Sequence, residues 1–546
     1  MRQPKPDYME YPELIMEIGN GAIKIPDFQR RVVWDIGQTL YLLDSISKGF
    51  PIGSFIFWQT QERMKAHRNI GDLALKESPD NQLINYILDG QQRLTSLYAC
   101  IKGAVINTKK YQVFCDLDAS GEDETFKLES SDPTRFVDIG DLLGDEPQKV
   151  SKSLSDERQK RFDKLRETFR LYKFPVIRIE DQPLDVVCEM FTRINNTGTE
   201  LDLFDLMVAK TWMDNFNLRD KYNELSSNLR KAQYDELAAS VVLQIAGAIV
   251  KGGCTRKHIL SITRDDVTEY WVEIVNATNL AVDFLRDHLG IPSTRLLPYQ
   301  SCVVPIAYFF YRNEFKQPKS SQARILNRYF WRSAAIERYS SGTESKLGQD
   351  IRDIDKLVKD EKDLESLFSW PEGWVSFTSD KIIRTELSLS NAFCKMILAF
   401  LASSHPLSFE NNTPVRVDSS NLARSNSRHY HHFFPKAYLK KKGVSEDHAN
   451  SVANICLVPA ASNLHYQDNS PKDYLKPILE ENPNLGGALK SHFIELEPKF
   501  GIETDDYDMF LQERADSIIL GLAGLIYTNE EFDTAFADYN GIEDDN

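Results

Sequence analysis

The hydrophobic pattern of this 546-residue chain changes near residue 213, and this change limits the fold more than any other feature. Before that point, short apolar runs of the strand type alternate with helical spacing, as in an α/β domain. After it, long amphipathic helices dominate. The length exceeds what one ordinary core accommodates. The sequence therefore predicts an α+β multidomain protein, with an α/β domain at 1–213, a helical connecting region at 214–400 and a third domain at 401–546.

Apolar spacing also predicts where the elements lie. In the first domain, strands are expected at 22–25, 53–58, 83–88, 111–117 and 174–179, and helices at 36–47, 91–101 and 184–194. The acidic, polar segment 120–152 is expected to be a surface insertion. In the middle region, long helices are expected at 220–251, 265–289 and 320–339.

Charge is distributed unevenly along the chain. It carries 81 Asp+Glu against 65 Lys+Arg, which argues against non-specific coating of nucleic acid. No acid occurs from 419 to 445, however, where six Lys/Arg and three of the ten histidines lie. Because phosphate affinity depends on the local field, this basic segment is predicted to face DNA, although a solvated helix end is the alternative. The residues expected to contact DNA are Arg428, Lys436, Lys440, Lys441 and Lys442.

The sequence predicts neither secretion nor a membrane span. The first twenty residues lack a continuous apolar region, and the most apolar runs, 241–250 and 302–311, are about half the length of a membrane span. The seven cysteines show no CxxC spacing, which argues against a disulfide framework and a cysteine zinc site. We expect a cytoplasmic protein with reduced thiols.

The basic segment leads into a pattern that suits phosphodiester hydrolysis. His431 and His432 lie on one predicted strand, Asn454 on a second, and Asn463 on a following helix. Strand, long loop, strand and helix is the order of the ββα-metal nucleases. Histidine has the pKa of a general base, and neighbouring strand residues face opposite sides, so one ring can meet a metal and the other a water. A side-chain amide offers the oxygen that Mg²⁺ or Mn²⁺ prefers.

The string HHFFP, followed by NICLVP and a further Asn nine residues after Asn454, resembles the HNH endonucleases. It is most similar to the C-terminal nuclease domain of GmrSD-type, type IV restriction enzymes, domain-of-unknown-function family 1524. The resemblance implies that His432 is the general base, Asn454 the central asparagine, and His431 and Asn463 the ligands of Mg²⁺ or Mn²⁺. The family more often has a carboxylate where this chain has His431.

A second pattern lies in the first domain, in NYILDGQQRLTSLY. An apolar strand ends at Asp89 and Gly90, and a helix opens with Gln91, Gln92 and Arg93. Free backbone N–H groups, a positive dipole end and a guanidinium then meet at one place, which suits a phosphate. Thr95 follows one turn later. There is no Walker A motif. Two further segments add Gln29 and Arg30 upstream and Asn195 downstream.

The strings IPDFQRRVVWD, ILDGQQRLTSLY and FTRINNTGTELD together resemble the N-terminal domain of the same GmrSD-type proteins, family 262. This resemblance implies a ParB/sulfiredoxin-like fold that binds or hydrolyses a nucleoside triphosphate. The residues then assigned to nucleotide binding are Gln29, Arg30, Asp89, Gly90, Gln91, Gln92, Arg93, Thr95 and Asn195.

The two resemblances predict a phosphodiester hydrolase of the HNH type, in particular a DNA endonuclease or nickase that acts against phage or modified foreign DNA. A nucleoside triphosphate is expected to regulate it, with NTPase activity, and a homodimer would allow both strands to be cut. One alternative is a ParB-like nucleotide switch that binds DNA or a partner and carries a vestigial nuclease domain. Another is an RNA-cleaving toxin.

Overall fold

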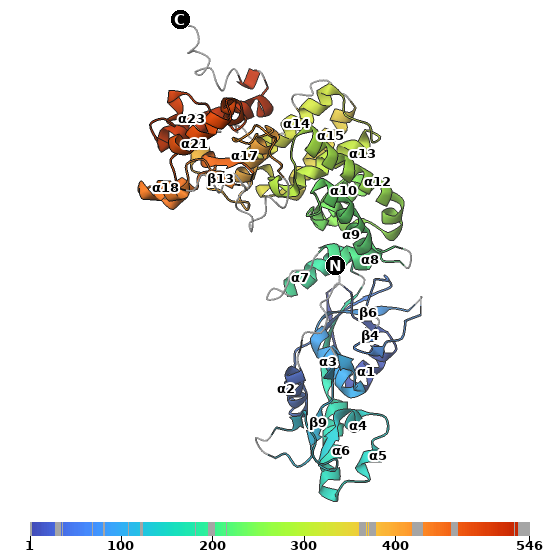
Figure 1. Ribbon diagram of the computed structural model, residues 1–546. Helices are drawn as coiled ribbons and strands as arrows, with labels where there is room; N and C mark the ends of the chain where they lie inside the picture. Colours follow the sequence, from blue (N-terminus) through green and yellow to red (C-terminus); the bar gives the residue numbers. More distant parts are fainter. Residues whose placement is uncertain are drawn as a thin grey trace. The chain divides into compact units, whose positions relative to one another are not determined.

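The computed structural model in Figure 1 shows two compact units, Met1–Leu218 and Arg219–Asn546. Both units contain helices and strands, which confirms an α+β multidomain protein. The structure describes residues 3–27, 34, 36–67, 69–79, 82–106, 109–120, 124–180, 182–194, 203–213, 216–359, 367–368, 370, 378–417, 430–459, 468–528 and 530–532.

The described part of unit 1 is built on a mixed five-stranded sheet, in the order β1-β12-β3-β6-β2. β12 runs parallel to β3 and β2 parallel to β6, whereas β3 and β6 are antiparallel. β6 lies between β3 and β2, and its apolar residues are buried. The strands are β1 (Lys5–Glu10), β2 (Ile23–Lys24), β3 (Phe55–Thr60), β6 (Ile84–Asp89) and β12 (Lys173–Glu180).

Helices that pack on one another complete the core of unit 1. The helices α2 and α7 begin and end at the predicted residues, and α3 extends one residue beyond its prediction. Their apolar faces follow the helical period, so the sequence signal was strong. The helices are α1 (Tyr11–Gly19), α2 (Ile36–Ser47), α3 (Gln91–Lys102), α6 (Asp156–Leu171), α7 (Leu184–Ile194) and α8 (Leu203–Thr211).

The acidic segment 120–152 is not a surface insertion, so that prediction was wrong. It contributes β10 (Phe126–Lys127) and β11 (Phe136–Asp138), which pair with β9 (Phe114–Asp116). It also forms α4 (Ile139–Leu143) and α5 (Gln148–Ser151). The apolar side chains between its acids enter the same core as α3, and their spacing was obscured by the high charge. The buried members are Phe126, Val137, Ile139, Leu142 and Leu143.

Unit 2 begins with a group of helices in which α10, α12 and α13 contact one another and α15 packs against α13 (Figure 1). α12 starts at a capping box between Thr263 and Asp266 and continues into a π-helical turn, Phe284–His288, close to the predicted range 265–289. The helices are α9 (Leu218–Leu229), α10 (Ala239–Lys251), α11 (Arg256–Ser261), α12 (Arg264–Asp283), α13 (Val303–Arg312), α14 (Ser320–Ala335), α15 (Thr343–Val358), α16 (Ser379–Ile383) and α17 (Ala392–Ser403).

The continuous helix predicted at 220–251 is wrong. Between α9 and α10 the chain forms a 3-10 turn and then adopts a left-handed conformation at Gln233, with φ of 64°. This reversal places Tyr234 in the core, where its hydroxyl donates to the carbonyl of Ile291 at 2.9 Å. A tertiary contact therefore interrupts an amphipathic pattern that by itself favours one helix.

The last part of unit 2 carries a short pair of strands, β13 (Tyr430–His432) and β14 (Ile455–Leu457). The helices that follow or flank them are α18 (Lys436–Lys441), α19 (Glu446–Ala449), α21 (Pro471–Glu481), α22 (Leu485–Lys490) and α23 (Tyr507–Ile526). α23 packs against α14 and α16, so this part and the helical part belong to one unit. Within the described ranges, no helix is long and apolar enough to cross a membrane.

Candidate functional site

The pair of strands β13 and β14 brings the two histidines close to Asn454. The strands are antiparallel, with His431 opposite Cys456 and His432 opposite Ile455. Asn454 was predicted to lie on the second strand. It lies in the 3-10 turn directly before β14, which is the end of the pair next to His432. Asn463, the predicted second metal ligand, lies outside the described residues.

Asn454 joins the two ends of the loop between these strands. Its side chain is fully buried, and its Oδ1 accepts a hydrogen bond from the amide of Phe434 at 2.8 Å. Its Nδ2 donates to the carbonyls of Phe434 at 3.0 Å and Ala449 at 3.1 Å. One amide thus satisfies backbone groups at both ends of the loop, where unpaired polar groups would be costly. The backbone just after His432 is held in one conformation as a result.

His432 is oriented by Asn450, a residue that none of the sequence motifs includes. The ring Nε2 lies 3.1 Å from Oδ1 of Asn450. An amide oxygen only accepts, so Nε2 carries the proton and Nδ1 keeps the lone pair that can take a proton from water. Burial lowers the pKa of His432 to about 4, and the nearby charge of Lys436 acts in the same direction. The imidazole is therefore neutral at pH 7. An asparagine in a loop gives no signal of this role.

His431 has a different environment from its neighbour. Only 2% of its surface is exposed. Its ring contacts those of Phe409 and Tyr474, with centroids 6.5 and 6.1 Å away. Within the described ranges, no group of three or more His, Cys, Asp or Glu side chains could hold a metal ion. The described residues by themselves therefore do not complete a metal site around His431.

Arg514 on α23 supports this arrangement from the core. Its fully buried guanidinium donates to the carbonyls of Ala453 and Ile455, each at 2.6 Å, and to that of His492 at 3.1 Å. It therefore holds the chain on both sides of Asn454. Burial lowers the pKa of Arg514. An arginine on the apolar stripe of a helix was the sequence signal for this role, and none of the sequence-based predictions drew on it.

The predicted DNA-binding lysines fall into two groups. Lys436 lies 3.7 Å from a carboxylate oxygen of Glu446, and Lys441 forms an ion pair with Asp468. Lys440 and Lys442 are exposed and form no ion pair among the described residues, although Lys442 lies over the ring of Tyr438 at 5.5 Å. Part of the positive charge of α18 is thus neutralised within the protein. Arg428 lies outside the described residues.

The turn from β6 to α3 has the predicted shape. Gly90 adopts φ of 92°, and a Cβ at this position would lie 2.5 Å from the ring of Phe55, so only glycine fits. Arg93 lies in the first turn of α3, where it donates to the carbonyl of Ile52 at 2.6 Å and to Asp89 at 3.1 Å. These bonds involve two of its five N–H groups. The guanidinium is thus held at the N-terminus of α3, in an ion pair with Asp89.

The other described residues predicted to bind a nucleotide are buried or hydrogen-bonded within the protein. Gln92 accepts a hydrogen bond from the amide of Trp34 at 3.3 Å, and Gln91 is largely buried. Thr95 is fully buried, and its hydroxyl has no hydrogen-bond partner among the described residues. It lies inside the domain, away from solvent. Gln29, Arg30 and Asn195 lie outside the described residues.

Comparison with known proteins gives two similarities. The chain is 25% identical to the uncharacterized protein MJ0686 of Methanocaldococcus jannaschii over 559 aligned positions, which cover 90% of this chain and 93% of that protein. The second similarity is to a protein family and ends at residue 212, before the two histidines. Residues 12–212, which contain the turn from Asp89 to Arg93, match the N-terminal domain of the GmrSD restriction endonucleases.

Proposed function

We propose that the protein is a DNA endonuclease or nickase of the HNH type, acting in defence against phage or modified foreign DNA under the control of a nucleoside triphosphate. The observation that carries the nuclease part is the geometry around Asn454. Its side-chain amide forms hydrogen bonds with both ends of the loop that follows β13. Beside it lies His432, whose ring is oriented by a hydrogen bond to Asn450. The match of residues 12–212 to the GmrSD N-terminal domain supports the assignment.

His432 is the proposed general base. Its neutral imidazole accepts a proton from water at Nδ1, while Asn450 holds Nε2–H and thereby fixes the ring. Asn454 and Arg514 keep the backbone of the site in place. Hydrogen bonds from the loop before β14 and from α23 thus position the site.

Metal dependence belongs to the proposal on the strength of the family resemblance. His431 and Asn463 are the proposed ligands of Mg²⁺ or Mn²⁺, a cation that would stabilise the phosphate charge when bound. The described residues do not form a complete site. EDTA-resistant cleavage would contradict this part of the proposal.

The nucleotide pocket is proposed at the start of α3. Gly90 permits the close turn, and Arg93 lies at the helix N-terminus with the backbone amides. Both features suit a phosphate. A homodimer would place two nuclease sites on one DNA duplex, as double-strand cleavage requires.

One observation favours the alternative of a nucleotide switch with a vestigial nuclease domain. His431 is almost completely buried among aromatic side chains, as expected of a histidine that only packs. Cleavage of plasmid DNA with Mg²⁺ or Mn²⁺, with and without each nucleoside triphosphate, tests the two functions. Modified and unmodified phage DNA and a structured RNA are the other substrates. If the His432→Ala variant no longer cleaves, the result supports the nuclease, whereas nucleotide binding without cleavage of any substrate supports the switch.

A further inference from the structure

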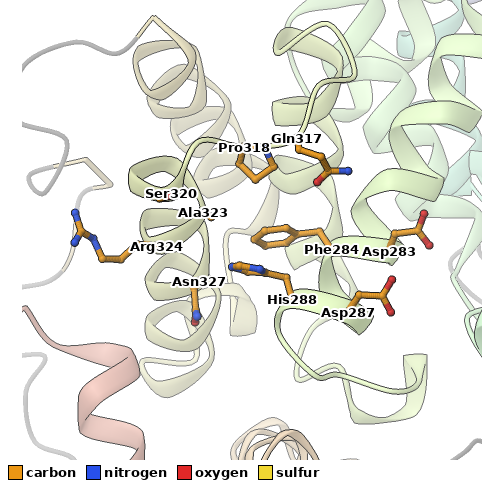
Figure 2. Close-up of a pocket in the computed structure, with 10 residues that line it drawn as sticks. All are labelled: Asp283, Phe284, Asp287, His288, Gln317, Pro318, Ser320, Ala323, Arg324 and Asn327. Atoms are coloured by element: carbon orange, nitrogen blue, oxygen red, sulfur yellow. The ribbon is translucent and has the colours of Figure 1, made fainter.

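A pocket of about 630 Å³ lies in unit 2, between the end of α12 and the start of α14 (Figure 2). The stacked rings of Phe284 and His288 line it. Figure 2 shows the guanidinium of Arg324 pointing away from these rings on one side, and the carboxylates of Asp283 and Asp287 pointing away on the other. These three charged groups therefore do not converge on one ligand. The turn before α3 in unit 1 differs in this respect.

Three neighbours hold the guanidinium of Arg93 in that turn. Its Nη1 donates to the carbonyl of Ile52 at 2.6 Å, and its Nη2 donates to Oδ2 of Asp89 at 3.1 Å. Its central carbon lies 5.5 Å from the centroid of the buried Phe55 ring, a distance at which a cation is attracted to an aromatic face. Only 16% of the Arg93 side chain is exposed. The guanidinium therefore has one well-defined position.

Gly53, in the segment between α2 and β3, makes this position possible because it has no side chain. A Cβ added to Gly53 would lie 2.3 Å from Nη1 of Arg93, well inside the contact distance of two heavy atoms. Gly53 also has φ of 83°, in the left-handed region that favours glycine. None of the three sequence strings assigned to the nucleotide site includes Gly53. Its contact with Arg93 is visible only in the folded chain.

We propose that Gly53 is a positioning residue of the nucleotide site. It leaves the space in which the Arg93 guanidinium lies, and it thereby fixes this guanidinium and the carboxylate of Asp89 at the N-terminus of α3. The inference rests on the proposed binding of a nucleoside triphosphate at this turn. Gly53 acts through Arg93 and not through a contact with the nucleotide.

A side chain at position 53 should act on the site and leave the fold in place. Two heavy atoms do not remain 2.3 Å apart, so Nη1 of Arg93 has to leave the carbonyl of Ile52. The guanidinium is the far end of a flexible side chain, and it moves more easily than the backbone does. Gly53→Ala is therefore expected to displace the guanidinium without unfolding the domain.

Gly49 provides a matched control in the same segment. It has φ of 71°, and a Cβ at this position meets no heavy atom of the described residues within 4 Å. Alanine at either glycine introduces backbone strain, but only alanine at position 53 meets the guanidinium. A difference between the two variants therefore reports the contact with Arg93.

Calorimetry on the full chain measures the affinity for the β,γ-imido analogues of ATP, GTP, CTP and UTP, which are not hydrolysed. Gly53→Ala should weaken binding by roughly tenfold or more, the value of one charge-assisted hydrogen bond, whereas Gly49→Ala should match the wild type. The double variant Gly53→Ala/Arg93→Ala should bind as weakly as Arg93→Ala and no more weakly, because the guanidinium through which Gly53 acts is already absent. Additive losses, or equal affinities of Gly53→Ala and Gly49→Ala, would overturn the proposal.

A second measurement does not depend on nucleotide binding. Phenylglyoxal modifies arginine side chains, and mass spectrometry gives the rate of modification at Arg93. Gly53→Ala should raise this rate severalfold because the guanidinium leaves Ile52 and Asp89, whereas Gly49→Ala should not. Thermal unfolding should give nearly the same midpoint for the two alanine variants. A much lower midpoint for Gly53→Ala would assign Gly53 to the stability of the domain and overturn the proposal.

The two measurements separate failure of this inference from failure of the proposed function. If the wild type binds none of the four analogues, the nucleotide pocket is refuted, while a raised modification rate still shows that Gly53 holds Arg93 in place. If the wild type binds an analogue and Gly53→Ala leaves the modification rate unchanged, the pocket stands and the role of Gly53 is refuted.

Discussion

At the scale of single residues, the hydrogen bond between Asn450 and His432 leads to a prediction about the pH dependence of the cleavage rate. His432→Ala should reduce cleavage by about 10²–10⁴-fold, the usual contribution of a general base. Asn450→Asp places a carboxylate beside the ring and should raise the pKa of His432 above its present value of about 4. The acid limb of the cleavage-rate profile should then move to higher pH. Asn450→Ala should lower the rate without that movement, and a profile unchanged in both variants would contradict a positioning role.

At the same scale, the burial of His492 leads to a prediction about how the stability of the folded state depends on pH. It is fully buried, and burial lowers its pKa from 6.5 to about 3. Below pH 6.5 the unfolded chain binds a proton that the folded chain takes up only near pH 3, so the folded state becomes less stable as the pH falls between these values. The decrease approaches about 1.4 kcal/mol per pH unit for this group. Thermal unfolding followed from pH 7 to 4 should show a weaker pH dependence for His492→Gln than for the wild type.

At the scale of elements, α23 is predicted to hold β14 through Arg514. Replacing Arg514 by Met keeps the bulk of the side chain but leaves the carbonyls of Ala453, Ile455 and His492 without this donor. Since each unpaired buried carbonyl costs about 1–3 kcal/mol, the free energy of unfolding should fall by roughly 3 kcal/mol or more. Urea denaturation measures the change. Arg324→Met, an exposed arginine on α14, is the control and should have little effect; an equally small effect at Arg514 would refute the prediction.

The exposed lysines of α18 and its C-cap give a second prediction at this scale. Lys440 and Lys442 have no ion pair among the described residues, whereas Lys441 is paired with Asp468. If the first two bind phosphates, replacing both by Gln should flatten the slope of log K against log[salt] by about 0.9 for each phosphate that is no longer bound. Lys441→Gln, the matched control, should change the slope less. DNA affinity across a salt series, measured with His432→Ala present, decides between this and a solvated helix end.

At the scale of the whole molecule, the two units are predicted to separate nucleotide control from catalysis. Arg93→Ala removes the guanidinium at the start of α3 and should weaken nucleoside triphosphate binding by roughly tenfold to a hundredfold, the value of a charge-assisted bond. The β13–β14 site belongs to unit 2, so cleavage itself should persist while its response to the nucleotide disappears. Unchanged nucleotide affinity, measured by calorimetry, would argue against the pocket.

Local sequence determined those features that depend on neighbouring residues. The helical spacing of α2 and α7 predicted their bounds because each has an apolar face that repeats with the helical period. The turn at Gly90 followed from a strand ending in Asp-Gly before a helix. The strand pairing of β13 with β14 could be expected from the order of the segments, and it places His432 beside Asn454.

Only the tertiary structure decided the features that depend on residues far apart in the chain. The helix predicted at 220–251 is broken between Leu229 and Ala239, where Tyr234 is buried and donates to the carbonyl of Ile291. The acidic segment 120–152 enters the core through a few apolar side chains. The hydrogen bond between His432 and Asn450 likewise joins residues that are far apart in the sequence. The same is true of the hydrogen bond from Arg514 to β14. How deeply a side chain is buried depends on the whole unit. The sequence around His431 and His432 has no periodic pattern that predicts their burial. Burial lowers the pKa of His432 to about 4, and the same core encloses His431 among aromatic rings.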